Sequence, residues 1–205
     1  MDTKVIPDII VGRLPIYLRA LQSMLAEGRR VTSSQELGER LGISAAQIRK
    51  DLSQFGEFGK QGTGYSIEYL ANQIQQILKV DRVWDIAVVG AGDIGSAVAR
   101  YQGFANRGFR VTMVFDNNPA KVGAKVGPFT VQDSAEIEEV LRKVGMQVAM
   151  IATPGAEAQA VADSLVKAGV RAILNYAPTS LSVPEDVQVQ YIDPVIHLQR
   201  MTYYL

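Results

Sequence analysis

Three glycines directly after a short apolar run constrain the fold of this chain more than any other feature. The run, residues 86–89, is expected to form a buried parallel strand, and Gly90, Gly92 and Gly95 follow it. At these positions a tight turn, a close approach of the backbone to a pyrophosphate, and close packing of the next helix each exclude a β-carbon. That helix directs its free N–H groups at the phosphates. The spacing therefore predicts a dinucleotide-binding βαβ unit.

An acidic residue lies at the distance that such a unit requires. A second apolar run, residues 111–115, ends at Asp116, 21 residues after Gly95. A carboxylate at this strand end accepts hydrogen bonds from both hydroxyls of an adenosine ribose and repels a 2′-phosphate. The expected ligands are therefore NADH and NAD⁺ rather than their phosphorylated counterparts.

From residue 81 onward, apolar strands alternate with helical segments, as in an α/β fold with a Rossmann-type, doubly wound parallel sheet. The expected strands are 86–89, 111–115, 148–152, 171–174 and 188–191. Such sheets bind ligands at the carboxyl ends of their strands. The residues that we expect to bind the cofactor are Gly90, Ala91, Gly92, Asp93, Ile94, Gly95, Asp116, Asn117, Lys121, Thr153, Pro154, Asn175, Tyr176, Ala177 and Pro178.

The N-terminal part of the chain has helical spacing of its apolar residues instead. Residues 7–26 predict an amphipathic helix, with Pro15 at an irregular start or a kink. Ser33 with Glu36, and Ser44 with Gln47, predict capping boxes that open two short helices, 33–41 and 44–55. Because Gly42 separates them, the pair predicts a helix-turn-helix.

The third of these helices presents two different faces. Ile48, Leu52 and Phe55 fall on one side and are expected to pack inward, while Lys50 and Ser53 point the opposite way. An outer face of this kind can donate to phosphates and base edges, although most charged helix faces are simply solvated.

The segment after that helix favours the DNA-binding interpretation. Residues 56–65 hold four glycines around Lys60, which is typical of the β-hairpin wing of a winged helix, and residues 66–79 predict a linking helix. The candidate DNA contacts are Ser33, Ser34, Ser44, Gln47, Arg49, Lys50, Ser53, Lys60, Gln61, Gly62 and Tyr65.

Composition sets broad limits. The 205 residues carry 21 Lys and Arg against 21 Asp and Glu, so net charge alone does not indicate nucleic acid as a partner. The absence of cysteine excludes disulfides and thiol chemistry. No apolar run approaches the roughly 20 residues of a membrane span, and the N-terminus has no signal-peptide pattern. We therefore expect a cytoplasmic protein without a membrane partner.

Several motifs together resemble one known family. They are Thr32-Ser33-Ser34, Gln47-Ile48-Arg49-Lys50-Asp51-Leu52-Ser53-Gln54-Phe55-Gly56, Gly62-Thr63-Gly64-Tyr65, the glycine fingerprint followed by Tyr101-Gln102-Gly103-Phe104, Phe115-Asp116-Asn117-Asn118-Pro119-Ala120-Lys121-Val122-Gly123, and Ile173-Leu174-Asn175-Tyr176-Ala177-Pro178. In this order they resemble the Rex family of bacterial redox-sensing repressors, over essentially the whole chain.

The resemblance implies a homodimer that binds double-stranded operator DNA and represses genes of fermentative and anaerobic metabolism until NADH releases it. It implies a winged-helix domain with a linker helix at 1–80, a Rossmann NAD(H)-binding domain at 81–192, and a helix at 193–205 that is swapped between subunits. It also assigns three residues to the switch between states: Arg19, Tyr101 and Asp193.

Two alternatives belong to other functional classes. An NAD-dependent dehydrogenase needs a proton donor beside the nicotinamide, and His197, the single histidine, lies in the terminal helix. A CoA-binding module has a similar glycine-rich domain, but Asp116 would repel the 3′-phosphorylated ribose of CoA.

Overall fold

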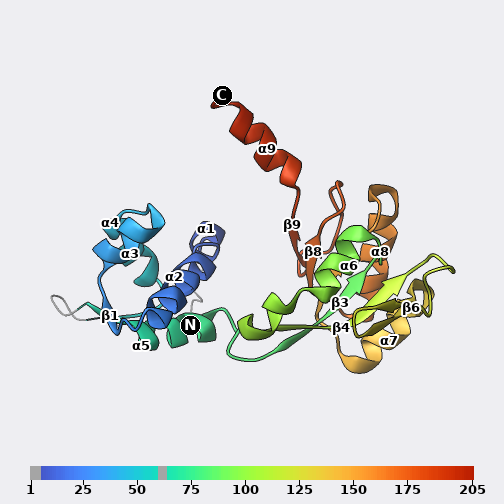
Figure 1. Cartoon of the computed structure of the whole chain (residues 1–205), viewed down its shortest axis with the longest axis horizontal. Helices are drawn as coiled ribbons and strands as arrows, with labels where there is room; N and C mark the ends of the chain where they lie inside the picture. The colour runs from blue at the N-terminus through green and yellow to red at the C-terminus, as the bar shows by residue number, and fades with distance from the viewer. Residues whose placement is uncertain (1–5, 60–63) are drawn as a thin grey trace. The chain divides into compact units, whose positions relative to one another are not determined.

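The computed structural model describes residues 6–59 and 64–205. They form two compact units, Met1–Arg82 and Val83–Leu205, which are blue to teal and green to red in Figure 1.

The first unit is helical. Its helices are α1 (Asp8–Val11), α2 (Leu14–Ala26), α3 (Ser34–Leu41), α4 (Ala45–Leu52) and α5 (Ile67–Ile77), and its strands are β1 (Val31–Thr32) and β2 (Tyr65–Ser66). The single helix expected at 7–26 is interrupted at Gly12 and Arg13. Pro15 lies in the first turn of α2, where its missing N–H costs nothing.

The helix-turn-helix is formed by α3 and α4. Ser33 Oγ accepts a hydrogen bond from the N–H of Glu36 (3.1 Å), and Ser44 Oγ accepts one from the N–H of Gln47 (3.2 Å). Gly42 ends α3 in the left-handed region at φ 67°. The capping boxes are formed in one direction only, because the side chains of Glu36 and Gln47 are engaged elsewhere. α4 ends at Leu52, three residues earlier than expected, and the chain turns at Ser53.

The core of this unit is made by the inner faces of its helices. Fully buried side chains include Leu14, Tyr17, Leu21 and Met24 of α2, Leu37 of α3, Ile48 of α4, and Ile67, Leu70 and Ile74 of α5. Among the described residues, the stretch Asp8–Ala26 is long and apolar enough to cross a membrane by length and composition. The buried residues of α2 within this stretch belong to this core, and core helices of globular proteins commonly meet the same criterion.

The expected β-hairpin wing is only partly visible. Residues 56–59 form no strand, and β2 pairs antiparallel with β1 (Val31 with Ser66, Thr32 with Tyr65). Lys60, Gln61 and Gly62 lie outside the described residues.

The second unit contains a seven-stranded sheet, and all of its residues are described. The strands are β3 (Trp84–Val89), β4 (Phe109–Asp116), β5 (Lys125–Val126), β6 (Phe129–Asp133), β7 (Val148–Ile151), β8 (Ala172–Asn175) and β9 (Gln188–Tyr191), in the order β5-β6-β4-β3-β7-β8-β9. All neighbouring strands are parallel except β5 and β6, which are antiparallel. β5 and β6 were not predicted from the sequence, because they are short or interrupted by polar residues.

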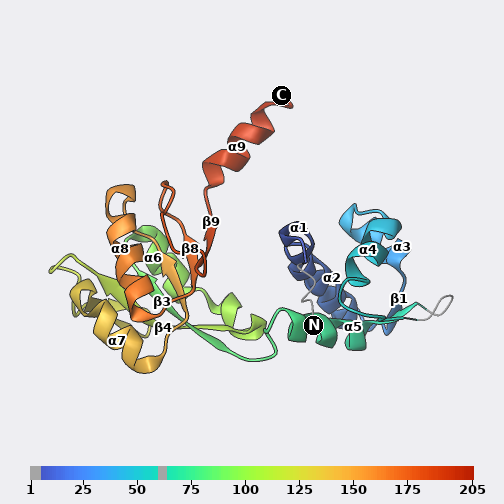
Figure 2. The same cartoon turned by 180° about the vertical axis from the view of Figure 1, so that it is seen from behind.

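Helices cover both faces of this sheet (Figure 1 and Figure 2). They are α6 (Asp93–Arg100), α7 (Ile137–Val144) and α8 (Gly155–Ala168), with short 3₁₀ turns at Gln102–Arg107 and Ser134–Glu136. Ile86 and Val88 of β3 pack in the cluster that contains Ala99 of α6, whereas Ala87 and Val89 pack in the cluster with α7 and α8. The strand order reverses between β3 and β7, which marks the place where doubly wound sheets bind ligands.

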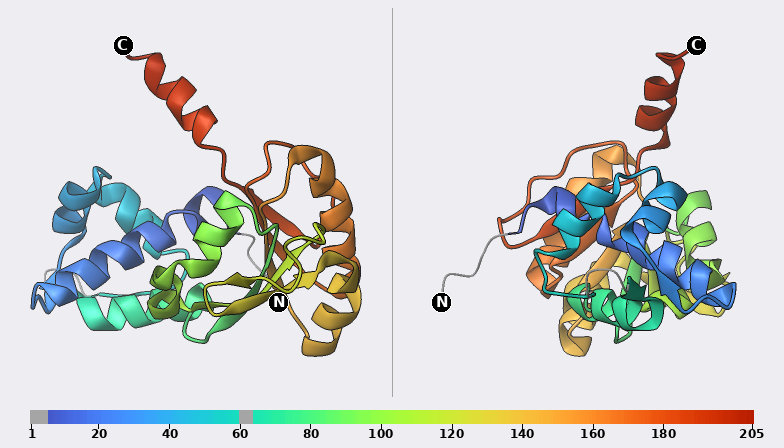
Figure 3. Two further views of the ribbon diagram at one scale, coloured as in Figure 1. Left: turned by 45° about the vertical axis from the view of Figure 1, so that its right-hand side comes forward. Right: turned by 90° about the vertical axis from the view of Figure 1, so that its left-hand side faces the viewer.

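The terminal helix α9 (Pro194–Thr202) extends beyond β9 (Figure 3). Asp193 caps it, because its Oδ1 accepts a hydrogen bond from the N–H of Val195 (2.9 Å), and Pro194 occupies the first helical position. Every residue of α9 is exposed. Its apolar side chains are therefore without cover in the single chain.

Candidate functional site

A cavity of about 850 Å³ lies at the carboxyl ends of β3, β4 and β7. It is lined by Val89, Gly90, Gly92, Asp93, Ile94, Asp116, Asn117, Asn118, Lys121, Ser134, Ile137, Ala152, Thr153, Pro154, Ala156, Glu157, Ala160, Val161 and Ser164. Its volume lies within the range of small-molecule and cofactor sites.

The three fingerprint glycines have different physical roles. Gly90 has φ 101°, and an added β-carbon would lie 2.5 Å from the carbonyl oxygen of Ala152. A β-carbon at Gly95 would collide with the carbonyl of Gly90. Gly92 lines the cavity, and an added β-carbon there would meet no protein atom within 4 Å. The first and third glycines therefore permit packing, while the second leaves space for a ligand beside the first turn of α6.

Asp116 is buried at the end of β4 and already accepts three hydrogen bonds. Its Oδ2 accepts from the N–H of Ala91 (2.7 Å) and from Lys121 Nζ (3.1 Å), and its Oδ1 accepts from the N–H of Asn118 (2.8 Å). Burial by itself would raise the pKa of this carboxyl, but these hydrogen bonds outweigh it and hold the pKa below its usual value.

This arrangement alters the expected ribose contact. A carboxylate has about four acceptor positions, so Asp116 has one left, on Oδ1. Asp116 can therefore accept from one ribose hydroxyl, while Lys121, which has further N–H donors, can donate to the other.

Thr153 supplies a second sign that the cavity suits a polar ligand. Its hydroxyl oxygen is buried and has no hydrogen-bond partner among the described residues, and the residue lines the cavity. A buried hydroxyl without a partner costs about 1–3 kcal/mol. A ligand that bonds to it recovers that free energy, so the residues present fit a dinucleotide.

The structure places the expected cofactor residues in two groups. Nine of them line the cavity: Gly90, Gly92, Asp93, Ile94, Asp116, Asn117, Lys121, Thr153 and Pro154. The others act behind or beside it: Ala91 donates to Asp116, Gly95 packs on Gly90, and Asn175, Tyr176, Ala177 and Pro178 lie outside the lining. The buried amide of Asn175 donates to the carbonyls of Ala177 and Thr179, so it shapes its own loop.

One wall of the cavity is formed by α8 and was not predicted from the sequence. Ala156, Ala160 and Ser164 line the cavity at intervals of four residues, with Glu157 and Val161 beside them. A stripe of small residues along one face of a helix was the available signal, because it lets a planar ligand approach closely.

The second candidate site is the outer face of α4. Ile48 and Leu52 are buried and Phe55 packs against the core, as expected, whereas Arg49 and Lys50 are exposed. Ser53 is also exposed. Arg49 Nη1 donates to Ser34 Oγ (2.9 Å), which joins the start of α3 to the middle of α4.

The remaining expected DNA contacts have local roles. Ser33 and Ser44 cap α3 and α4. Tyr65 is half-buried on β2, and burial raises the pKa of its hydroxyl. The amide of Gln47 is directed inward, where its Nε2 donates to Asp51 Oδ1 (2.7 Å).

Asp51 itself was overlooked, although helical spacing marks it. It lies three residues after Ile48 and next to Leu52, so it belongs to the inner face of α4, and it is fully buried. An acidic residue among the inward positions of a short helix was the signal.

The three expected switch residues lie in both units. Arg19 is exposed on α2 of the helical unit. Tyr101 follows α6 in the second unit and is half-exposed, with its ring edge-on to Phe104 at 5.0 Å between centroids. Asp193 caps α9.

Two protein families match this chain, one in each of its two units. Residues 81–179 match the family described as CoA binding domain, and residues 5–53 match the family described as putative DNA-binding protein N-terminus.

The chain is also similar to curated proteins over nearly its whole length. It is 54% identical over 199 residues to the redox-sensing transcriptional repressor Rex of Chloroflexus aurantiacus, covering 97% of this chain and 94% of that protein. It is 42% identical to the Rex of Carboxydothermus hydrogenoformans, with 97% and 95% covered. It is 43% identical to that of Streptomyces coelicolor, with 97% and 77% covered.

Solved structures give the same result. The structure of RSP in complex with β-NAD⁺ and operator DNA is 36% identical, with a TM-score of 0.93 over 98% of this chain and 93% of that chain. The structure of RSP in complex with β-NADH is 33% identical, with a TM-score of 0.89 over 98% and 95%. The chain therefore belongs to the Rex family of redox-sensing transcriptional repressors.

Proposed function

We propose that this protein binds operator DNA as a repressor, binds NAD⁺ and NADH in the cavity at β3 and β4, and leaves DNA when NADH binds. The observation that carries the proposal is the presence in one chain of a helix-turn-helix with exposed Arg49 and Lys50 and of a dinucleotide-sized cavity with Asp116 at its edge. The relatives are repressors, and one was solved with NAD⁺ and operator DNA and with NADH. The protein is accordingly a regulator, not an enzyme, and we propose that it acts in the cytoplasm.

The cavity residues would each hold a part of the cofactor. Gly92 and the first N–H groups of α6 suit the pyrophosphate, and Asp116 with Lys121 suits the adenine ribose. Thr153 offers a hydroxyl that has no hydrogen-bond partner within residues 6–59 and 64–205. The nicotinamide ring is positive in NAD⁺ and neutral in NADH, so apolar surroundings disfavour NAD⁺ by desolvation. Ile94, Ile137 and Val161 supply apolar surface to this cavity.

The DNA-binding module is proposed to be a winged helix in which α4 enters the major groove. An added β-carbon at Gly59 would lie 2.8 Å from the carbonyl oxygen of Gly64, so the chain on either side of residues 60–63 comes together. This proximity is what the base of a hairpin wing requires, with Lys60, Gln61 and Gly62 between the two ends.

The experiment that tests the proposal is DNA binding to a palindromic duplex selected by this protein from a random-sequence library. Fluorescence anisotropy would follow release while NADH and NAD⁺ are varied separately. We expect release by NADH at lower concentration than by NAD⁺. Because binding linkage is reciprocal, operator DNA should weaken NADH binding by the same factor. Failure of NADH to shift DNA affinity would contradict the proposal.

Calorimetry distinguishes NADH from CoA, the ligand that the second-unit family match suggests. Trp84 is a poor fluorescence reporter for this purpose, since it begins β3 while the cavity lies at the other end of that strand. We expect heat from NADH and none from CoA at equal concentration.

The oligomer is proposed to be a homodimer in which α9 is exchanged between subunits. Val195, Leu198 and Met201 lie on one side of α9 and are 55%, 59% and 64% exposed. Full burial of each such side chain contributes about 1.5–3 kcal/mol of favourable free energy, so covering them with a partner subunit would stabilise a dimer. A dimer also allows two recognition helices about 34–36 Å apart, the spacing of adjacent major grooves.

Leu198→Glu is expected to convert the dimer into monomer at micromolar concentration, since it places a charge in the covered face. Sedimentation velocity measures the change. Arg200→Glu, on the opposite side of the same helix, is the matched control and should leave the dimer intact. A dimer that survives Leu198→Glu would contradict the exchange of α9.

Asp193→Asn tests the switch without removing the helix cap, because asparagine caps a helix about as well as aspartate. We propose that Asp193 pairs with Arg19 in one state and accepts a hydrogen bond from Tyr101 in the other. The variant should keep DNA and NADH binding but lose at least half of their coupling, which is about 1–3 kcal/mol in typical allosteric proteins.

The measured quantity is the NADH concentration that releases operator, divided by the NADH dissociation constant of the DNA-free variant. Asp193→Ala adds the loss of the cap, so a difference between the two variants reports the capping contribution. A ratio equal to that of the wild type would remove Asp193 from the switch and leave the repressor function standing.

A further inference from the structure

Asp51 is a fully buried carboxylate on the recognition helix that the proposed function leaves unexplained. It lies in the last turn of α4, next to the exposed Lys50, and its side chain has no accessible surface. A buried carboxylate without partners is costly, so its neighbours must compensate for lost hydration.

Four donor atoms surround this carboxylate. Arg13 donates from Nε to Oδ2 (2.5 Å) and from Nη2 to Oδ1 (2.8 Å). Tyr17 Oη donates to Oδ2 (2.6 Å), and Gln47 Nε2 donates to Oδ1 (2.7 Å). Together they occupy all of the acceptor positions of Asp51. Burial opposes ionisation of Asp51, but the hydrogen bonds outweigh it and hold its pKa below the usual value, so the group is charged.

The donors tie α4 to the beginning of α2. Arg13 lies in the short turn between α1 and α2. Tyr17 follows in α2, and its ring is fully buried. The apolar contacts of Ile48 and Leu52 are non-directional, so they specify the orientation of α4 less strictly than a directional contact does. A bidentate arginine–carboxylate pair is directional and fixes one geometry. The network therefore sets the orientation of α4 as well as its attachment.

We propose that Arg13, Tyr17, Gln47 and Asp51 form a positioning network that holds the recognition helix in the one orientation that reads the operator. The inference rests on the proposed function, in which α4 lies in the major groove. Contacts to base edges depend on placement of the helix within about 0.5 Å, whereas contacts to phosphates are independent of sequence. Weakening the network should therefore reduce operator selectivity more than general DNA affinity.

Tyr17→Phe is the primary test, since it removes one hydroxyl and keeps the buried ring. Affinity for the operator and for an unrelated duplex of equal length is measured by anisotropy at one salt concentration, at a temperature where melting curves show full folding. We expect the operator affinity to fall about tenfold, as for loss of a hydrogen bond to a charged group, and the unrelated duplex to change less than about threefold.

Further variants separate positioning from folding. The selectivity ratio is the affinity for the operator divided by the affinity for the unrelated duplex. Asp51→Asn should lower this ratio by a larger factor than Tyr17→Phe does. Arg13→Lys should retain more selectivity than Arg13→Met. Equal losses for both duplexes in Tyr17→Phe would mean a purely structural role and would overturn the inference.

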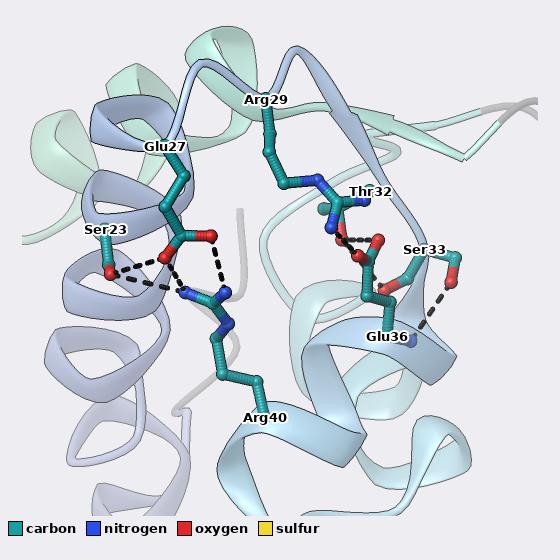
Figure 4. Close-up of polar contacts among 7 residues, drawn as sticks. All are labelled: Ser23, Glu27, Arg29, Thr32, Ser33, Glu36 and Arg40. Carbon is teal, nitrogen blue, oxygen red and sulfur yellow. Dashed lines mark hydrogen bonds and ion pairs between the residues drawn. The ribbon is translucent and has the colours of Figure 1, made fainter.

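The matched control is an ion pair that ties α3, not α4, to α2. Arg40 Nη1 and Nη2 donate to Glu27 Oε1 and Oε2, both at 2.7 Å, near the pairing of Arg29 with Glu36 and the bond from Thr32 to Glu36 (Figure 4). Glu27→Gln weakens this pair without touching α4, so the selectivity ratio should stay at the wild-type value.

The outcomes distinguish the two proposals. If the wild-type protein binds its operator selectively and the ratio is unchanged in Tyr17→Phe and Asp51→Asn, the network inference fails alone. If the wild-type protein does not discriminate between the duplexes, the proposed repressor function fails first.

Discussion

Arg49→Ala and Lys50→Ala are each expected to reduce operator binding to the level of unrelated DNA, with NADH affinity within about threefold of the wild type. Both residues are exposed on α4, and Arg49 is oriented by Ser34 at the start of α3. One good bidentate contact to a base contributes roughly 1–3 kcal/mol of discrimination, and lost phosphate contacts add to this. Gel-shift titration with operator and unrelated duplexes measures the effect.

Two controls make this result specific. Lys143→Ala removes one positive charge from the exposed end of α7 in the other unit and should leave operator binding unchanged. Ser34→Ala keeps the charge of Arg49 but releases its side chain, so an intermediate loss is expected. Wild-type operator affinity in Arg49→Ala or Lys50→Ala would contradict the assignment of α4 as the recognition helix.

Asp116→Ala is expected to remove most of the preference for NADH over NADPH. In the proposed site the carboxylate would bond the ribose and repel a 2′-phosphate, and a juxtaposition of like charges in a binding site costs several kcal/mol. The substitution also leaves Lys121 without its partner at 3.1 Å, and a free ammonium attracts a 2′-phosphate. Calorimetric titration with both nucleotides measures the ratio of the two dissociation constants.

Lys121→Met separates the two charges. With Asp116 intact, this variant should discriminate against NADPH at least as strongly as the wild type. The double variant Asp116→Ala, Lys121→Met should show almost no preference. Equal binding of NADH and NADPH by the wild-type protein would show that Asp116 does not select the cofactor. Because Asp116→Ala leaves the N–H groups of Ala91 and Asn118 without an acceptor, each variant needs a melting curve beside its titration.

The parts of the fold predicted from sequence depend on interactions between residues close in the chain. The capping serines and the helix end at Gly42 each involve residues within four positions of one another. The strand ends at 86–89 and 111–115 were found because buried parallel strands are continuous apolar runs. The edge strand β5 and its neighbour β6 lacked that pattern, and the third helix ends early because the chain turns at Ser53.

The features of the candidate site that were predicted from sequence also depend on local spacing. The glycine turn and Asp116 follow from a spacing that the βαβ unit imposes, so the sequence by itself predicted a dinucleotide ligand and the strand ends that line the cavity. The exposed face of α4 likewise followed from helical periodicity.

Only the tertiary structure decided what the buried carboxylates bind. Ala91 and Asp116 are 25 residues apart, and Arg13 and Asp51 are 38 residues apart. No local pattern links such pairs, because they meet through the packing of separate elements. The same packing made Gln47 turn inward and placed the small residues of α8 along the cavity. Sequence periodicity predicts the face of a helix or strand on which a side chain lies. The hydrogen-bond partner of that side chain depends on which other element packs against this face.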